Sequence, residues 1–294
     1  MTTRMGLWSR TIIGAAAFAL GGCLSYNEPC QGLVDGAEDV IGHLSDDVFL
    51  DKPNARHANH AIGLIAAEAF IGAFTDSDKP AQLGIFNGGA IRDEGGVEGA
   101  DGQCITRNRI EAGPVTRGEL HQILFFDNVV YATDLTEQEL FAVMEHSVAE
   151  LSRKGTQITF PSGRFLQLAG GRVTVNCSLP VGARIEALEV AGEVLSRTGT
   201  RAFRVAMSEF LLRGGDGYDM LAVASQDASR DLRQAQVEGG IDNRIVAAWM
   251  KRTYGVEASA FRVEQLPKMG CAADAASCLA PITLRECAEP PDPN

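Results

Sequence analysis

The stretch that decides the fold is Leu83-Gly84-Ile85-Phe86-Asn87-Gly88-Gly89-Ala90-Ile91-Arg92. Its first four residues form an apolar run that predicts a buried strand. The glycine pair that follows lets the backbone turn sharply and approach a ligand closely. An amide, Asn87, and a guanidinium, Arg92, stand at the two ends of that turn. The stretch therefore predicts a strand that leads into a polar ligand-binding turn.

A second stretch, Phe210-Leu211-Leu212-Arg213-Gly214-Gly215-Asp216-Gly217-Tyr218, places an aromatic ring six positions before an aspartate that is surrounded by glycines. Each stretch alone is a weak signal, because Asn-Gly-Gly marks any turn. Together they supply an amide, an arginine, a ring and a carboxylate. That set suits a polar, planar, partly anionic ligand such as a nucleotide.

In this order, the two stretches resemble the C-terminal domain of the 5′-nucleotidase / UDP-sugar hydrolase family. Three more segments carry the likeness: Arg56-x-x-Asn59, Ile123-Leu124-Phe125-Phe126-Asp127-Asn128 and Gly163-Arg164-Phe165-Leu166-Gln167. The resemblance runs from about Pro53 to Val263. It implies an α+β fold of mixed β-sheets flanked by helices. Strand-like runs mixed with separated helices, without regular βαβ alternation, predict the same class.

The resemblance also implies a set of substrate-binding residues: Arg56, Asn87, Arg92, Phe126, Phe210 and Asp216. Asn87 and Arg92 match positions that contact the nucleotide, the arginine through phosphate or ribose oxygens. Phe126 and Phe210 match the two rings that sandwich the base, although Phe125 could instead be the ring that faces outward. Asp216 matches a carboxylate that accepts hydrogen bonds from ligand hydroxyls.

Arg56 matches the family's arginine only if one residue is inserted after Asn59. The neighbouring His57-x-x-His60 could in principle bind zinc. No carboxylate or cysteine ligand is evident nearby, so the sequence favours a solvent-exposed helix start. We therefore expect no metal site in this chain.

The metal-binding strings of the family's catalytic domain set this chain apart from the complete enzymes. Those enzymes hold two metals with Asp-x-His, Gly-Asp-x-x-Asp, Gly-Asn-His-Glu and Gly-His-x-His strings. This chain has five histidines and neither His-x-His nor Gly-Asn-His, and its one Gly-Asp-x-x-Asp stands in the wrong context. We expect no catalytic residue and no cofactor. The metallophosphatase half is expected on another polypeptide, which leaves open whether this chain takes part in hydrolysis.

The N-terminus predicts export. Arg4 and Arg10 precede a short apolar run that ends in Leu20-Gly21-Gly22-Cys23, a string that resembles a bacterial lipobox. The run is too short for a bilayer span of about 20 residues and suits a signal peptide. We expect residues 1–22 to be removed and Cys23 to carry lipid. The protein would then contact the membrane only through this lipid anchor. The alternative is a plain signal peptide with an accidental cysteine.

The remainder divides into a tether (23–52), a 5′-nucleotidase C-terminal-like domain (53–267) and a tail with cysteines and prolines (268–294). Six cysteines remain after Cys23. In an exported chain they predict up to three disulfides, with fifteen ways of pairing. Cys271 and Cys278 are favoured as a local pair, and free structural thiols are the alternative.

The formal charge of −12 argues against non-specific binding of nucleic acid, which needs a basic surface. The sequence therefore predicts an exported, membrane-anchored lipoprotein that binds a nucleoside or nucleotide, as the specificity part of a two-chain hydrolase linked to nucleotide catabolism outside the cytoplasm. The alternative is a structural or interaction lipoprotein of the cell envelope whose pocket has decayed.

Overall fold

The computed structural model describes residues 34–44, 47–50, 52–92, 96–98, 104–106, 109–157, 162–254 and 281–289. The predictions for the signal peptide, Cys23 and the Cys271–Cys278 pair lie outside these residues. No helix within the described ranges is long and apolar enough to cross a membrane. The helices are α1 (Lys52–His57), α2 (Ala61–Gly72), α3 (Arg117–Ile123), α4 (Glu137–Ser147), α5 (Glu209–Leu212), α6 (Asp219–Gln226) and α7 (Asp242–Tyr254).

The strands form two larger sheets and three short pairs. A five-stranded sheet has the order β14 (Arg233–Gln234), β8 (Val130–Thr136), β13 (Ala202–Ser208), β3 (Leu83–Asn87), β9 (Leu166–Ala169). A four-stranded sheet has the order β12 (Glu193–Val194), β11 (Ile185–Val190), β10 (Gly171–Asn176), β15 (Ile282–Arg285). The pairs join β1 (Val40–Leu44) to β7 (Gly113–Thr116), β2 (Val48–Phe49) to β6 (Arg109–Ile110) and β4 (Gly96–Glu98) to β5 (Cys104–Thr106).

Strand β3 is the central element of the fold, and every one of its residues is buried. It pairs in parallel with β13 and antiparallel with β9, which makes the sheet mixed. Ile85 packs into the core cluster shared with α4 and α6, whereas Phe86 packs into the cluster shared with α2 and α7. The predicted buried strand and the predicted α+β class of mixed sheets are therefore confirmed.

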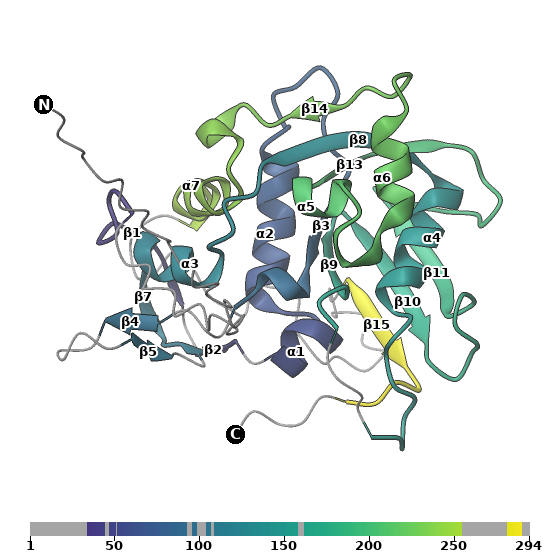
Figure 1. Ribbon diagram of the computed structural model, residues 1–294, viewed down its shortest axis with the longest axis horizontal. Helices are drawn as coiled ribbons and strands as arrows, with labels where there is room; N and C mark the ends of the chain where they lie inside the picture. The colour runs from purple at the N-terminus through teal and green to yellow at the C-terminus, as the bar shows by residue number, and fades with distance from the viewer. Residues whose placement is uncertain are drawn as a thin grey trace, which may run out of the picture.

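Helix α2 lies directly against β3, with α7 beside it (Figure 1). Apolar side chains surround α2, as expected for a helix that is buried on nearly all sides. A Cβ at Gly84 would lie 2.1 Å from the carbonyl oxygen of Ala67 on α2. The glycine therefore allows the helix and the strand to approach this closely.

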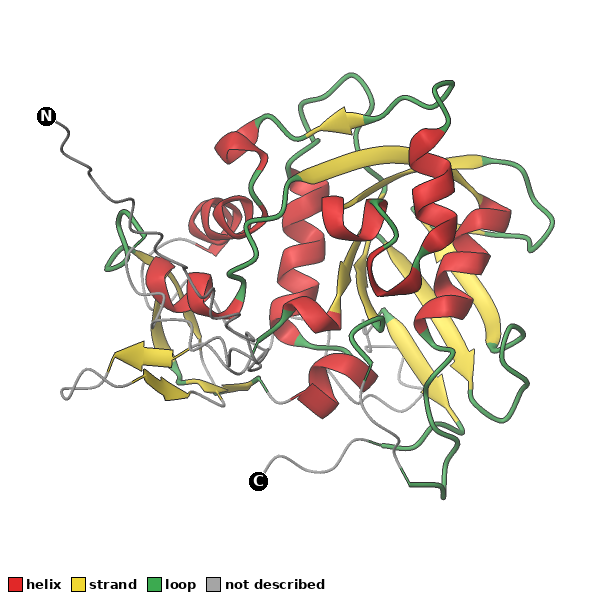
Figure 2. Cartoon of the chain, viewed as in Figure 1, coloured by secondary structure: helices red, strands yellow, loops and turns green. Residues whose placement is uncertain are grey.

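Strand β15 belongs to the segment that the sequence predicted as a tail, yet it pairs in parallel with β10 (Figure 2). The Asn59 side chain holds it, donating to the carbonyl of Ile282 at 2.8 Å and accepting from its amide at 3.2 Å. A disulfide joins Cys177 to Cys287, a pair that the sequence left open. Contacts far apart in sequence thus fix this strand.

Helix α4 begins as predicted and ends earlier. The string Thr136-x-x-Glu139 is a capping-box pattern that predicts a helix start, and the two residues form that box. The sequence predicted a helix to about residue 152, but the helix ends at Ser147. The reason is Arg184, whose Nη1 donates to the carbonyl oxygens of residues 148, 149 and 151 and so satisfies the chain after the last turn.

Two strands lie within the segment predicted as a tether. β1 pairs with β7, and β2 pairs with β6, so residues 40–44 and 48–49 belong to the folded body. Ile41 and Leu50 are buried in the core cluster around α2.

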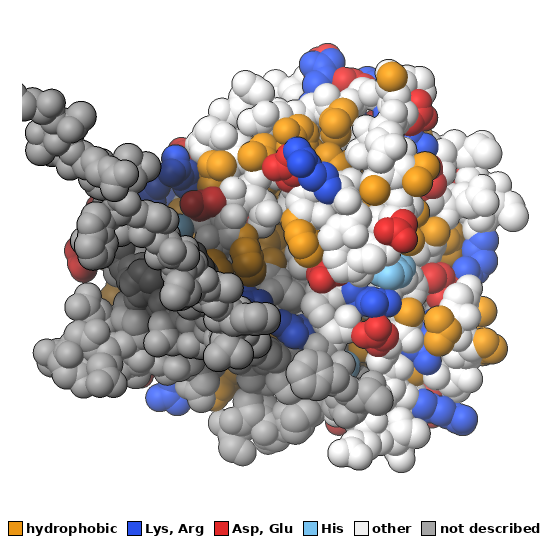
Figure 3. All heavy atoms as spheres, in the orientation of Figure 1, with side chains coloured by type: hydrophobic (Ala, Val, Ile, Leu, Met, Phe, Trp, Pro, Cys, Tyr) orange, Lys and Arg blue, Asp and Glu red, His pale blue; other side chains and the backbone are white. Residues whose placement is uncertain are grey.

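Charged side chains of both signs are interspersed on the face shown in Figure 3.

Candidate functional site

One cavity of about 310 Å³ brings together all six of the residues expected to bind substrate. Its size falls within the range of small-molecule sites. The lining comes from the ends of β3, α1, the loop after α3, α5 and the turn after α5. The lining residues are Arg56, Asn87, Gly89, Ala90, Arg92, Phe126, Asn128, Gly163, Phe210 and Asp216.

A hydrogen bond joins the end of β3 to the glycine-rich turn after α5. Asn87 Nδ2 donates to Asp216 Oδ2 at 2.8 Å, across 129 residues of sequence. Asn87 is buried at the end of β3, and Asp216 has a left-handed backbone with φ of 54°. His146 Nε2 donates to the carbonyl oxygen of Asp216 at 2.9 Å and so supports this strained turn. Asn87 therefore holds the carboxylate of Asp216, and His146 holds its backbone.

Tyr218 holds the turn that carries Asp216 in place. Its side chain is fully buried, and its hydroxyl donates to the carbonyl oxygen of Arg164 at 2.5 Å. Burial raises the pKa of Tyr218 well above its usual value, so the hydroxyl keeps its proton and remains a donor. The turn that carries Asp216 is thereby tied to the chain that enters β9.

Two phenylalanine rings of the cavity are exposed: Phe126 retains 48% of its accessible surface and Phe210 retains 42%. Large apolar side chains exposed in a cavity point to a ligand. A Cβ at position 215 would lie 2.5 Å from the Phe210 ring, so Gly215 lets the backbone support one face of that ring. Phe125 stacks beside Phe126, with ring centroids 4.6 Å apart, but does not line the cavity.

The cations of the cavity come from Arg92 and Arg56. The guanidinium carbon of Arg92 lies 5.5 Å from the centroid of the Phe126 ring, which is a cation–π distance. Arg56 lies on α1, whose position depends on Gln167. The buried Gln167 side chain donates to the carbonyls of Ala55 and Ala58 at 3.1 and 2.7 Å and accepts from the amide of His60 at 2.8 Å.

The prediction of a solvent-exposed helix start at His57 and His60 is wrong. Both histidines are buried, with 3% and 1% exposure. His60 Nε2 donates to the carbonyl oxygen of Phe49 at 2.7 Å, because β2 packs against this segment. The two side chains are therefore structural parts of the core, a long-range effect that the local sequence does not indicate.

The described residues do not fit the two metals of the complete enzymes. Within them, no three histidine, cysteine, aspartate or glutamate side chains are grouped as a metal site requires. We therefore derive no step through a metal in this chain.

Sequence reasoning missed Asn128, which lines the cavity two positions after Phe126. Asn128 Nδ2 donates to Asp242 Oδ2 at 3.1 Å, and the amide of Asp242 donates to the carbonyl of Asn128 at 2.9 Å. Asp242 begins α7 and is buried. The only local signal for Asn128 was its place in the quoted Phe126-Asp127-Asn128 segment.

Replacing Asp242 by asparagine is expected to stabilise the fold at neutral pH. Burial raises the pKa of Asp242 to about 6, and the hydrogen bonds from Asn128 and the Asn243 amide only partly oppose this. Because the folded pKa lies above the unfolded value, the native state binds this proton more tightly, and that stabilisation is lost as pH rises through about 6. We expect Asp242→Asn to raise the unfolding free energy by about 1–2 kcal/mol at pH 7.5.

The check on Asp242→Asn is urea unfolding at pH 7.5 and at pH 4.5. The gain over wild type should shrink at the lower pH, where the carboxyl is protonated in the native state. Asp219→Asn, an exposed position on α6, serves as the control. A gain of equal size at both pH values would show that burial of the charge is not its cause.

Comparison with known proteins agrees with the geometry. A profile of the family described as "5′-nucleotidase, C-terminal domain" matches residues 40–223. The trifunctional nucleotide phosphoesterase protein YfkN of Bacillus subtilis (strain 168) is 25% identical over 198 residues, which cover 66% of this chain and 12% of YfkN. Protein 5NUC of Lutzomyia longipalpis is 30% identical over 118 residues, which cover 38% of this chain and 20% of 5NUC. The matches thus span a fifth or less of these relatives.

Solved structures show the same fold. The 5′-nucleotidase precursor from Thermus thermophilus matches 85% of this chain and 40% of its own, with a TM-score of 0.61 and 21% identity. The Haemophilus influenzae NAD nucleotidase matches 86% of this chain and 39% of its own, with a TM-score of 0.59 and 16% identity. The family profile covers more than half of the 294 residues, and the chain therefore belongs to the family of 5′-nucleotidase C-terminal domains.

Proposed function

We propose that this chain binds a nucleoside or nucleotide in the cavity between Phe126 and Phe210. The observation that carries the proposal is the meeting, in one cavity, of two exposed rings, two arginines and the Asn87–Asp216 pair. Stacking of a base on an aromatic ring contributes about 1–3 kcal/mol per base. A planar base would remove both rings from water at once.

The polar groups suit the rest of such a ligand. Asp216 Oδ2 accepts from Asn87, and its other carboxylate oxygen can accept from a ribose hydroxyl. Arg56 and Arg92 line the same cavity and can donate to phosphate oxygens. The cavity thus offers an apolar slot for a base next to a carboxylate and cations for the sugar and phosphate.

We propose further that the chain acts as the specificity part of a two-chain hydrolase, with a separate metallophosphatase chain as its partner. Relatives named phosphoesterase and nucleotidase support this, because the matched region is only part of each. The alternative is a structural lipoprotein with a decayed pocket. Such a protein would not bind nucleosides, so a binding measurement distinguishes the two hypotheses.

Replacing Arg92 by alanine tests the proposed ligand class. A charge-assisted contact to phosphate contributes about 1.5–3 kcal/mol, so AMP should bind at least tenfold more weakly. Adenosine lacks the phosphate, so its affinity should fall less. For adenosine, the variant removes only the contact of Arg92 with the Phe126 ring. Calorimetric titration of both ligands measures the difference. Equal losses for AMP and adenosine would argue against a phosphate contact at Arg92.

We also propose that the protein is exported and anchored through lipid at Cys23. The supporting observation is the lipobox-like Leu20-Gly21-Gly22-Cys23 after a short apolar run. Mass spectrometry of protein extracted from membranes should show residues 1–22 removed and Cys23 acylated. Cys23→Ala should release the protein from the membrane fraction. A soluble wild-type product cleaved at another position would rule out this anchor.

A further inference from the structure

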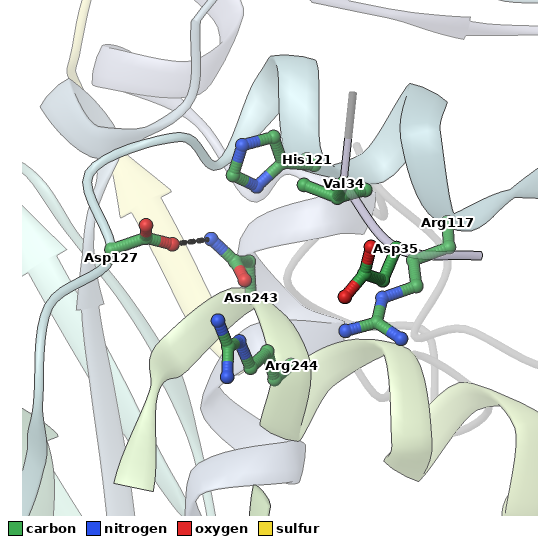
Figure 4. Close-up of a pocket in the computed structure, with 7 residues that line it drawn as sticks. All are labelled: Val34, Asp35, Arg117, His121, Asp127, Asn243 and Arg244. Carbon is green, nitrogen blue, oxygen red and sulfur yellow. Dashed lines mark hydrogen bonds between the residues drawn. The ribbon is translucent and has the colours of Figure 1, made fainter. Parts of the chain in front are cut away.

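A second cavity, of about 410 Å³, lies next to the first and is separate from it. The two share one short segment: Phe126 and Asn128 line the first cavity, and Asp127 between them lines the second. The second cavity is bounded by the start of α3, the start of α7 and the turn at residue 35 (Figure 4). We call it the Arg117–Arg244 cavity.

Two arginines from different helices face this cavity. Arg117 is the first residue of α3, and Arg244 lies in the first turn of α7. Both residues line the cavity, where the Arg117 guanidinium lies beside Asp35 and the Arg244 guanidinium lies on the Asp127 side of Asn243 (Figure 4). Among the described residues, neither guanidinium has a hydrogen bond or an ion pair, although most other arginines of the fold are paired. Two arginines that line one cavity without an ion pair there favour an anionic ligand.

The cavity lining carries two carboxylates, Asp35 and Asp127, which equal its two arginines in formal charge. Asp127 Oδ1 accepts from Asn243 Nδ2 at 2.7 Å, so this carboxylate is already engaged. Asn243 Nδ2 also donates to the carbonyl of Leu124 at 2.8 Å, which fixes the floor of the cavity. Asp35 lies in the cavity near Arg117 without an ion pair between them. An anion must therefore compete with both carboxylates, and Asp35 is the one that lies beside Arg117 (Figure 4).

His121 adds a neutral donor. It lies one turn after Arg117 on α3 and lines the same cavity. Burial lowers its pKa, and Arg117 and Arg244 act in the same direction, against Asp127 and Asn243. At neutral pH its imidazole is therefore uncharged and can donate one N–H to a ligand oxygen.

We propose that the Arg117–Arg244 cavity binds a phosphate group, either as inorganic phosphate or as the phosphate of a small ester. Guanidinium groups match phosphate oxygens with paired donors, and two of them reach from different helices. The volume exceeds that of the phosphate group alone and leaves room for an ester substituent. The site is independent of nucleotide binding in the first cavity, but the shared Phe126–Asn128 segment places the two ligands side by side.

Titration with inorganic phosphate at low ionic strength and pH 7.5 tests this site. Arg244→Met and Arg117→Met should each weaken phosphate binding at least tenfold, and the double variant should remove it. Asp35→Asn should strengthen binding about threefold or more, because a competing carboxylate is lost. Arg252→Met, which removes an exposed cation from the last turn of the same helix, should change binding less than twofold.

Two further arms separate this site from the first cavity. In Arg92→Ala, the phosphate binding that depends on Arg117 and Arg244 should remain. Ribose 5-phosphate should bind more tightly than inorganic phosphate if the site takes an ester, and no more tightly if it takes free phosphate. Phosphate binding that is lost in Arg92→Ala but kept in the double arginine variant would assign the anion to the first cavity. That result, or a wild type that binds no phosphate, overturns the proposed phosphate site. Neither result bears on whether nucleosides bind in the first cavity.

Discussion

Replacing both Phe126 and Phe210 by alanine is expected to weaken nucleoside binding more than any other change to the cavity. Each ring offers one stacking face, and each face contributes about 1–3 kcal/mol. The loss of both should therefore weaken binding by about 2 kcal/mol or more, which is roughly 30-fold at the least. Because both rings are about half exposed, their truncation should leave the fold intact.

Calorimetric titration with adenosine measures this loss, and thermal unfolding verifies the fold. Each single variant should bind more weakly than wild type, and the double variant should be weakest. Val223→Ala is the matched control, since Val223 is also an exposed apolar residue, on α6, and does not line the cavity. A double variant that binds adenosine as tightly as wild type would exclude this cavity as the base site.

Replacing Gln167 by leucine is expected to destabilise the fold and to weaken ligand binding together. Its side chain is fully buried and satisfies two carbonyls and one amide of residues 55–60. Each buried group left without a partner costs about 1–3 kcal/mol, so a loss of about 3–5 kcal/mol follows. Helix α1 would lose its support, and with it the position of Arg56.

Urea unfolding of Gln167→Leu measures the loss. Gln138→Leu, at an exposed position on α4, makes the same chemical change outside the core and should alter stability by about 0.5 kcal/mol or less. If Gln167→Leu unfolds within about 1 kcal/mol of wild type, the hydrogen bonds of Gln167 do not fix α1.

Elements with a local cause were predictable from the sequence. The apolar run at residues 83–86 formed β3, and the capping boxes at Thr116 and Thr136 begin α3 and α4. A capping box consists of four consecutive residues, so it can be recognised in the sequence without knowledge of any distant contact. The residues of the proposed site were assigned from the resemblance to the family, and the fold brings them to one cavity.

Elements with a distant cause were not predictable. Strand β15 exists because Asn59 and a disulfide to Cys177 hold a segment more than a hundred residues away. His60, which follows α1, is held in the core by Phe49 of β2 and by Gln167. Such packing leaves no periodic trace in the local sequence.

The glycines of the first turn illustrate the same limit. The sequence indicated that Gly88 and Gly89 allow close approach to a ligand. In the structure, a Cβ at Gly88 would lie 2.1 Å from the carbonyl oxygen of Ala55, and one at Gly89 would lie 2.8 Å from the Cα of Gly163. Close approach of backbone to backbone is therefore the first reason for both glycines, although Gly89 also lines the cavity.

Titration of the wild-type protein with adenosine and AMP is the most direct test of nucleoside binding between Phe126 and Phe210. We expect saturable binding at one site and competition between the two ligands. The spectroscopic signals of the residues that line that cavity should change on binding. Binding of AMP should be tighter than that of adenosine, because Arg56 and Arg92 are placed to meet a phosphate. No heat and no spectroscopic response at millimolar concentrations of either ligand would contradict the proposed function.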